Sequence, residues 1–110
     1  MMMATRILQL QDNNGDVEIP IRIFAPHQDK SAWKCRYEIG WPDGKFESEG
    51  YGQDAVQAIL LTCQKIGIEL YVSDEHKSGN LMWGEPGKGY GFPVPRTVRD
   101  LLIGNDKEFF

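Results

Sequence analysis

The chain has few cysteines, no excess of basic residues and no long hydrophobic run. Its two cysteines, Cys35 and Cys63, are too few and too far apart in the sequence for a disulfide scaffold or a zinc site. A formal net charge of −4 argues against a nucleic-acid-binding domain, which normally carries a basic stripe. No apolar run approaches the ~20 residues of a transmembrane helix. We therefore expect a reduced, cytoplasmic protein that binds neither nucleic acid nor membrane.

What is present is the composition of one folded domain. The 110 residues are 41% hydrophobic and 25% charged, close to the averages for folded proteins. A chain of this length normally forms one domain, here residues 1–110, and can bury a two-layer core. No internal repeat or low-complexity linker divides it.

Four segments alternate apolar and polar residues as β-strands do. They are residues 5–11 (TRILQLQ), 17–25 (VEIPIRIFA), 32–41 (AWKCRYEIGW) and 45–52 (KFESEGYG). Turn residues separate them, which predicts an antiparallel meander with one buried and one solvated face. Pro20 has no N–H to donate, so the second strand is expected at an edge of the sheet, or with the amide position of Pro20 facing outward.

The hydrophobic pattern also predicts the register of the last two strands. Pairing Trp41 with Phe46 across the PDG turn puts both side chains on the buried face and leaves Glu47 and Glu49 in water. Pairing Trp41 with Lys45 would bury Glu47, so the first register is predicted.

One long helix is predicted to begin at Asp54, because Asp54 and Gln57 have the spacing of a capping box. Two apolar sets follow at helical spacing. The predicted core stripe is Val56, Ile59, Leu60, Cys63, Ile66 and Leu70, and the second set is Ala58, Leu61, Ile68 and Val72. The sheet covers one set, so the C-terminal third or a partner must cover the other. Gly67 is a position where the helix is expected to kink or to end early.

The C-terminal third is predicted to add a short strand at 80–83, a loop rich in Gly and Pro, and a short helix over 98–103. Thr97 and Asp100 would cap this helix, and Gly104 would close it. The expected fold is α+β: a four-stranded antiparallel β-meander packed by one long α-helix and completed by this C-terminal strand, loop and helix.

The loop WGEPGKGYGFPVP (83–95) raises the question of phosphate binding. A P-loop needs G-x-x-x-x-G-K-[ST] before a helix, whereas here Gly89 follows Lys88 and two prolines forbid a helix. A type II turn at Pro86-Gly87 explains the loop better, so no nucleotide or other cofactor is expected.

Three aromatic residues surround this loop. Exposed aromatic residues beside a loop suit a binding surface, so Trp83 is a binding candidate together with Tyr90 and Lys88. Packing against the open side of the helix explains Trp83 and Phe92 better, and Tyr90 and Lys88 are the better candidates for an exposed surface.

Catalytic and metal sites find little support in the sequence. His76 lies between acidic residues and lysine at a predicted helix end, and the other histidine, His27, is distant, so no metal site is predicted. Both cysteines fall on core-facing positions and are expected to be free thiols near each other.

The solvated face of the sheet carries charges of both signs. They are Arg22, Lys34, Arg36, Glu38, Glu47 and Glu49. Cross-strand charge pairing explains them better than acid–base catalysis, because an open face does not desolvate a carboxylate. If a partner covers this face, Arg36 near its centre is the predicted hot spot.

Several segments together resemble a known family. They are ATRILQL, RIFAP, YEIGWPDG, GQDAVQAILL, IGIELY, GYGFPV and RDLLIG, spread over nearly the whole chain. The chain resembles a family of small bacterial proteins catalogued only as a domain of unknown function. The resemblance implies bacterial, cytoplasmic origin, and it transfers no catalytic motif, cofactor or site residue.

The leading hypothesis is a non-enzymatic protein that binds another macromolecule, as an adaptor or an immunity-type inhibitor does. No nucleophile, base and orienting group can be assembled, while small size, acidic charge and loop aromatics suit protein recognition. The alternative is a small-molecule-binding protein or enzyme with a cleft between the end of the long helix and the 84–92 loop. Its lining would be His76, Lys88, Tyr90 and Arg96. A third option is a homodimer through the second apolar helix face or the Phe109–Phe110 tail.

Overall fold

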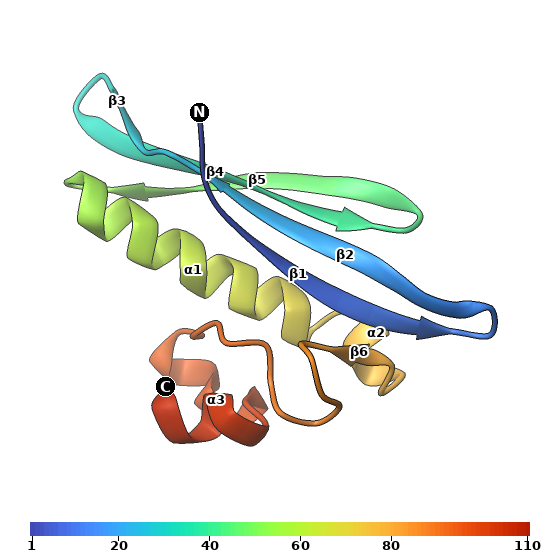
Figure 1. The fold of residues 1–110 in the computed structure, drawn as a ribbon. Helices are drawn as coiled ribbons and strands as arrows, with labels where there is room; N and C mark the ends of the chain where they lie inside the picture. The colour runs from blue at the N-terminus through green and yellow to red at the C-terminus, as the bar shows by residue number, and fades with distance from the viewer.

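Strands with alternating burial and one long helix dominate the computed structural model, which describes residues 1–110 (Figure 1). The strands are β1 (Met2–Asp12), β2 (Gly15–Phe24), β3 (His27–Asp29), β4 (Ala32–Trp41), β5 (Gly44–Gly52) and β6 (Leu81–Met82). The helices are α1 (Ala55–Tyr71), α2 (Asp74–Lys77), the 3-10 helix η1 (Arg96–Leu101) and α3 (Gly104–Phe109). Helix α1 lies against one face of the sheet, and the C-terminal segment packs beneath α1. The predicted α+β fold is confirmed.

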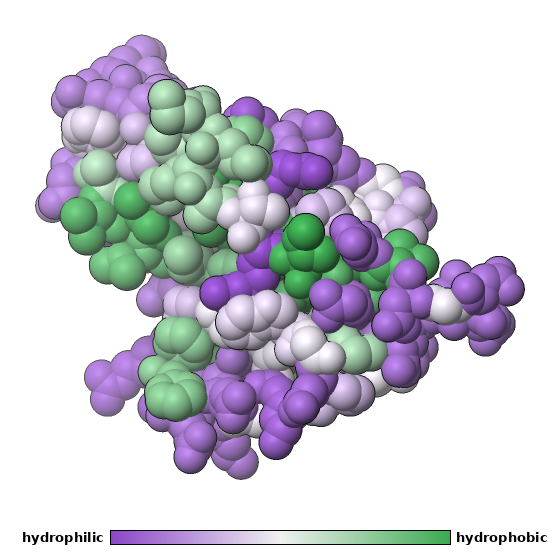
Figure 2. Space-filling view, viewed as in Figure 1, coloured by the Kyte–Doolittle hydropathy of each residue, from purple (hydrophilic) through white to green (hydrophobic).

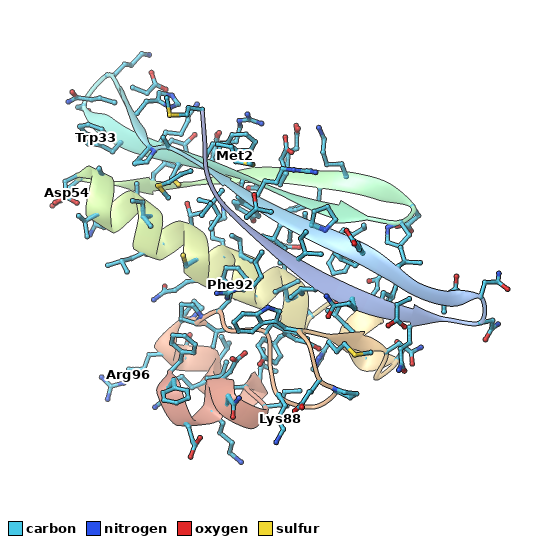
Figure 3. All side chains as sticks on the ribbon, in the orientation of Figure 1. Met2, Trp33, Asp54, Lys88, Phe92 and Arg96 are labelled. Carbon is cyan, nitrogen blue, oxygen red and sulfur yellow. The ribbon has the colours of Figure 1, made fainter.

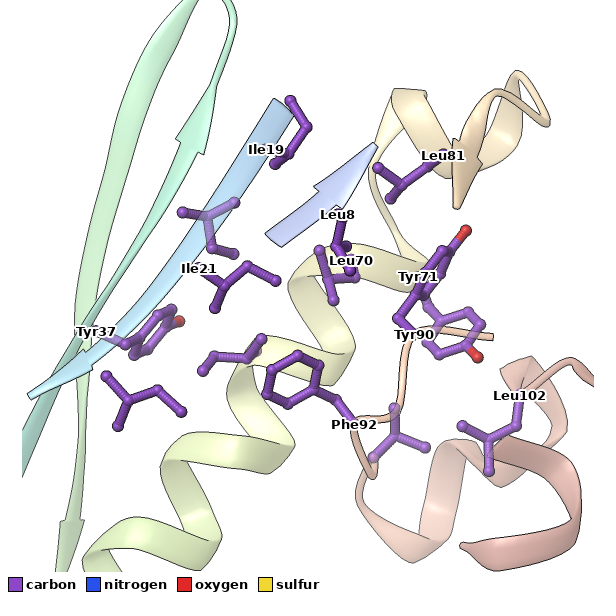
Figure 4. Close-up of a cluster of buried hydrophobic side chains, with 14 of the residues drawn as sticks. Leu8, Ile19, Ile21, Tyr37, Leu70, Tyr71, Leu81, Tyr90, Phe92 and Leu102 are labelled. Carbon is purple, nitrogen blue, oxygen red and sulfur yellow. The ribbon is translucent and has the colours of Figure 1, made fainter. Parts of the chain in front are cut away.

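The four long strands form the predicted antiparallel meander, in the order β1-β2-β4-β5. Two short strands extend it, since β6 pairs with the outer edge of β1 and β3 continues beside β4. The inward positions of β2 and β4 build the core, as expected from their alternation. Ile19, Ile21, Ile23, Cys35, Tyr37 and Ile39 are all buried. Figure 4 shows this core between the sheet, α1 and the C-terminal loop.

Strand β2 is an interior strand, so the first of the two alternatives predicted from Pro20, a place at an edge, is wrong. Its ladder with β4 includes only Ile21–Ile23 and stops beside Pro20. The ring of Pro20 lies against Gly40, where a Cβ atom would come within 2.9 Å of Pro20 Cγ. The missing N–H of Pro20 is therefore accommodated by ending the ladder rather than by an edge position.

The register of the β4–β5 hairpin differs from the prediction by two residues. Trp41 pairs with Gly44, and Phe46 pairs with Ile39 instead of Trp41. A two-residue hairpin loop is among the commonest connections, and it sets the register here. Because the side-chain period of a strand is two, the shift keeps Phe46 on the predicted face.

Helix α1 begins as predicted, but of the predicted core stripe only Ile66 and Leu70 are fully buried. Asp54 Oδ1 accepts a hydrogen bond of 2.8 Å from the amide of Gln57. The buried positions are Ala58, Thr62, Ile66, Gly67, Leu70 and Tyr71. Val56 and Leu60, which belong to the predicted core stripe, are 63% and 58% exposed.

The reason is the short distance between α1 and β5. Gly50 and Gly52 of β5 have no room for a Cβ atom, because Thr62 and Ala58 of the helix lie against them. Small side chains therefore face the sheet here, and a large apolar residue would force the helix away. Thr62 also donates a 3.0 Å hydrogen bond to the carbonyl of Cys35.

Gly67 neither kinks nor ends α1, contrary to the prediction. The helix continues to Tyr71. A Cβ atom at position 67 would overlap the carbonyl oxygen of Pro93, so glycine allows the C-terminal loop to cross the helix in direct contact. This glycine serves close packing.

The C-terminal third departs furthest from the prediction. The helix expected over 98–103 is the 3-10 helix η1, which has no side-chain cap. Gly104 begins α3 rather than closing a helix. It has a φ of +56° and lies against the backbone of Lys88, whose carbonyl accepts a 2.9 Å hydrogen bond from Asn105. Contact with residues 83–95, called here the glycine loop, thus decides the backbone conformation at Gly104.

Candidate binding site beside the open edge of β1

The glycine loop is held by a carboxylate of the protein itself. Asp106 of α3 is 2% exposed, and its Oδ2 accepts hydrogen bonds from the Tyr90 amide (2.8 Å) and the Tyr71 hydroxyl (2.6 Å). Its Oδ1 accepts a 2.7 Å bond from the Gly91 amide. Gly89 also lies so close that a Cβ atom there would meet the Asp106 carboxylate. Two of the loop amides, those of Tyr90 and Gly91, are therefore engaged by Asp106 and are not free to bind a phosphate.

Tyr90 is buried at 2% exposure, so its predicted place on the surface is wrong. Its ring centroid lies 5.1 Å from that of Tyr71, and its hydroxyl hydrogen-bonds to Nδ1 of His76. Burial, with the nearby negative charge of Asp106, raises the pKa of Tyr90 to about 12. Burial lowers the pKa of His76, so this pair is neutral near pH 7.

Trp83 and Phe92 differ in burial, although both are predicted to cover the open side of α1. Phe92 is buried in the core as predicted, whereas Trp83 is 43% exposed. The ring of Trp83 instead supports the guanidinium of Arg6, whose Cζ lies 3.9 Å from the ring centroid.

The four residues of the predicted cleft do not line one hollow. His76 and Tyr90 are in contact, but the largest hollow, of about 610 Å³, is lined by Lys88 and by none of the other three. Figure 3 shows Lys88 and Arg96 projecting from different sides of the C-terminal segment. The other residues at this hollow include Trp83, Glu85, Asn105 and Phe109.

Sequence reasoning missed Arg6, which lies between this hollow and a second one. Its Nη1 donates hydrogen bonds to the carbonyls of Gly91 (2.8 Å) and Tyr90 (3.2 Å). Its Cζ also lies 4.8 Å from the ring centroid of Phe92. No carboxylate lies within 4.0 Å of it. Burial lowers the pKa of Arg6, but a guanidinium stays protonated in proteins.

A signal for Arg6 was present in the sequence. Arg6 has the same strand parity as Leu8 and Leu10, the residues expected to face the core. A charged residue is rarely buried without a partner, so an arginine at an inward position of a strand indicates contacts that compensate its charge.

The second hollow, called here the Arg6 hollow, has a volume of about 360 Å³. Its walls come from β1, α1 and the C-terminal segment, and include Ala4, Arg6, Leu60, Cys63, Phe92 and Phe110. Figure 2 shows hydrophobic side chains gathered on this side of the molecule. Of the residues that line the hollow, Leu60 and Phe110 are exposed hydrophobic residues.

The edge of β1 beside the Arg6 hollow has no strand partner. β6 pairs only with Gln9 and Leu10, and the Gln11 amide donates to the carbonyl of Asn80 on the same edge. Alternate residues of a strand direct their backbone groups to the same edge, so Thr5 and Ile7 also point theirs away from β2. The side chain of Gln9 donates a 3.3 Å bond to the Ile7 carbonyl, and the other outward groups of Thr5 and Ile7 have no strand beside them.

The opposite face of the sheet carries the predicted cross-strand ion pairs. Glu38 is almost buried and lies within 4.0 Å of Arg22, Arg36 and Lys45. The guanidinium of Arg36 also stacks on the ring of Phe24, with Cζ 3.9 Å from the centroid. The charges on this face therefore compensate one another.

Three further findings concern function. No three side chains of the types that bind metal ions converge in the structure. None of the helices combines the length and apolar character needed to cross a membrane. Both cysteines are free, with Cys35 buried and Cys63 half-buried.

Residues 4–94 match a family described as a domain of unknown function, DUF6968. The chain belongs to this family. Neither a curated protein nor a solved structure matches it. The part shared with the DUF6968 family contains Arg6, Trp83 and the glycine loop, whereas η1, α3 and Asp106 follow it.

Proposed function

We propose that the protein is a non-enzymatic binding protein that takes an extended segment of a partner protein as an added strand on β1. The observation that carries this proposal is the open edge of β1 before Gln9, with the apolar Arg6 hollow directly beside it. Exposed strand edges bind extended peptides through backbone hydrogen bonds, and adjacent pockets select alternate side chains.

The other long open edge, that of β5, is less suited to a partner. Lys65 of α1 reaches it and donates hydrogen bonds to the Glu49 carbonyl (2.6 Å) and the Ser48 hydroxyl (3.2 Å). A lysine across a strand edge is a common way to prevent further pairing. The edge of β1 instead has exposed apolar neighbours in Met3 and Ile7.

The same residues give less support to an enzyme. His76 bonds to a buried tyrosine hydroxyl, and burial raises the pKa of the Cys63 thiol, which makes it a poorer nucleophile at neutral pH. The predicted role of Arg36 in partner binding stays a prediction, as do those of Lys88 and Arg96. Two free thiols suit a reducing compartment, so a cytoplasmic and bacterial setting is part of the proposal.

The test is affinity capture from a lysate of the source organism with wild-type protein and two variants at one position. Thr5→Pro removes an outward amide and blocks strand addition without removing a hydrogen bond to β2. Thr5→Val keeps the amide and is the matched control. We expect one stoichiometric partner with the wild type and Thr5→Val, and its loss with Thr5→Pro.

Amide exchange in the captured complex gives a second measurement. Thr5 and Ile7 should exchange more slowly than in the free protein. Equal capture by Thr5→Pro, or unchanged exchange at both amides, would show that the partner binds elsewhere. A partner identified as a second copy of this chain would give the homodimer that the apolar surfaces also predict.

A further inference from the structure

The Arg6 guanidinium is a half-buried charge with unused donors. A guanidinium has five N–H donors, and the two on Nη1 are used by the carbonyls of Tyr90 and Gly91. The three on Nε and Nη2 have no protein partner. Taking a charge out of water is costly unless an opposite charge or hydrogen bonds compensate it.

The nearby buried carboxylate, Asp106, attracts the Arg6 guanidinium through space and acts to raise its pKa, but it forms no ion pair with Arg6. Asp106 lies too far away for an ion pair, and it already accepts three hydrogen bonds from Tyr71, Tyr90 and Gly91. No aspartate or glutamate lines the Arg6 hollow. The hollow therefore has a local positive charge in a protein whose net charge is −4.

The geometry around Arg6 fixes the guanidinium in place. The ring of Trp83 lies 3.9 Å from Cζ on one side of the group, and the two carbonyls hold Nη1. A planar, oriented guanidinium with free neighbouring N–H groups is suited to a bidentate carboxylate. The other walls are mostly apolar and include Leu60 and Phe92.

We propose that the Arg6 hollow binds a carboxylate carried on an apolar chain. Resting on the proposed strand addition, we assign this group to an acidic side chain of the partner segment, flanked by apolar residues that contact Leu60 and Phe110. The hollow, at about 360 Å³, is within the size range of small ligand sites.

Octanoate is the probe for this site, and its binding is followed by the fluorescence of Trp83 and by amide shifts of Gly91. We expect saturable binding, with octan-1-ol and octylamine at least about tenfold weaker. Arg6→Gln should lower octanoate affinity by at least about tenfold, and Arg6→Lys by less. Arg36→Gln is the matched control, because it removes an equally stacked guanidinium from the other face, and it should leave the affinity unchanged.

Leu60→Asp tests the hollow independently of the Arg6 variants, which could lose binding because they fail to fold. Leu60 is exposed, so its substitution should leave the fold intact while it places a negative charge at the rim of the hollow. It should abolish octanoate binding. No saturable binding, equal binding of octan-1-ol, or full affinity of Leu60→Asp would each overturn the proposal.

Capture of the partner by the variants Thr5→Pro and Arg6→Gln distinguishes a failure of this inference from a failure of the proposed function. Loss of the partner with both Thr5→Pro and Arg6→Gln supports both. Loss with Thr5→Pro alone, with octanoate still binding at Arg6, assigns the site to a free small carboxylate and overturns the assignment to the partner segment. Capture that survives Thr5→Pro contradicts strand addition, while the octanoate titration still decides whether Arg6 binds carboxylates.

Discussion

Two arginines of this protein stack on aromatic rings at the same distance, yet their surroundings differ. Arg36 on the outer sheet face and Arg6 on the inner side each place Cζ 3.9 Å from a ring centroid. Arg36 Nη1 lies 3.1 Å from Glu38 and 3.8 Å from Glu47, whereas Arg6 has no carboxylate partner. In the outer region, around Arg36, glutamates balance the charge of the arginine. In the inner region, around Arg6, the guanidinium lies beside an apolar hollow and has no carboxylate partner.

This difference teaches which charged residue is available for binding. An arginine already paired with glutamates must break those contacts before it binds a new anion. Arg6 needs no such exchange, because its stacking and its carbonyl contacts leave one edge free. Exposure alone, which favours Arg36, is therefore a poor guide to function here.

The largest expected effect is on the inner region, from Asp106→Ala. The change leaves two backbone amides and the Tyr71 hydroxyl without their acceptor, and buried unsatisfied donors cost roughly 1–3 kcal/mol each. We expect a loss of about 3–5 kcal/mol in the free energy of unfolding, measured by urea denaturation. Asp100→Ala, an exposed carboxylate of η1, is the control, and a similar loss there would remove the special role of Asp106.

Alkaline pH should destabilise the fold in part through the buried tyrosine Tyr90. The pKa of Tyr90 is raised to about 12, against about 10 in an unfolded chain, so the neutral hydroxyl is favoured by folding. Its stabilising contribution is complete below about pH 10 and is lost as the pH rises toward about 12. Urea unfolding across this range measures the slope.

Two tyrosine variants check that assignment. Tyr90→Phe should reduce the alkaline loss of stability, whereas Tyr51→Phe, at an exposed tyrosine of β5, should leave most of it. The burial-raised pKa of Tyr71 acts in the same direction, so some slope persists in Tyr90→Phe. An unchanged slope in Tyr90→Phe would contradict the role given to Tyr90.

Replacing each arginine by alanine compares the two regions directly. Arg6→Ala removes two hydrogen bonds and two aromatic contacts and should cost about 2–3 kcal/mol of unfolding free energy. Arg36→Ala should cost about 1 kcal/mol or less, because exposed ion pairs contribute little. Thermal or urea denaturation of both variants measures the difference, and equal losses would break the comparison.

The smallest expected effect comes from freeing Arg36. In the double variant Glu38→Gln/Glu47→Gln, Arg36 loses both carboxylates but gains no apolar hollow. We introduce both changes into the Arg6→Gln variant and repeat the octanoate titration. We expect no more octanoate binding than with Arg6→Gln alone. New binding on the outer face would show that an unpaired guanidinium suffices without the hollow.

Local patterns predicted much of the fold. The alternation in β2 and β4 identified the buried faces correctly, because a strand repeats every two residues whatever it packs against. Asp54 was recognised as the start of α1 because its capping partner is only three residues away. The charge pairs of the outer face followed from alternation on neighbouring strands.

Two predictions were wrong because they depended on distant partners. The buried face of α1 could not be chosen from its own sequence, since Gly50 and Gly52 on β5 decide which side chains fit against the sheet. Tyr90 was expected outside because the sequence gives no sign that Asp106, 16 residues later, draws its amide inward.

The sequence by itself determined the strands, the start of the long helix and the absence of a phosphate-binding pattern, because these depend on residues a few positions apart. Only the tertiary structure decided that Arg6 meets the carbonyl of Tyr90, 84 residues away in the chain. Hydrogen bonds and close packing act over a few ångströms in space regardless of separation along the chain. The candidate site is made almost entirely of such contacts, whereas the elements around it are local.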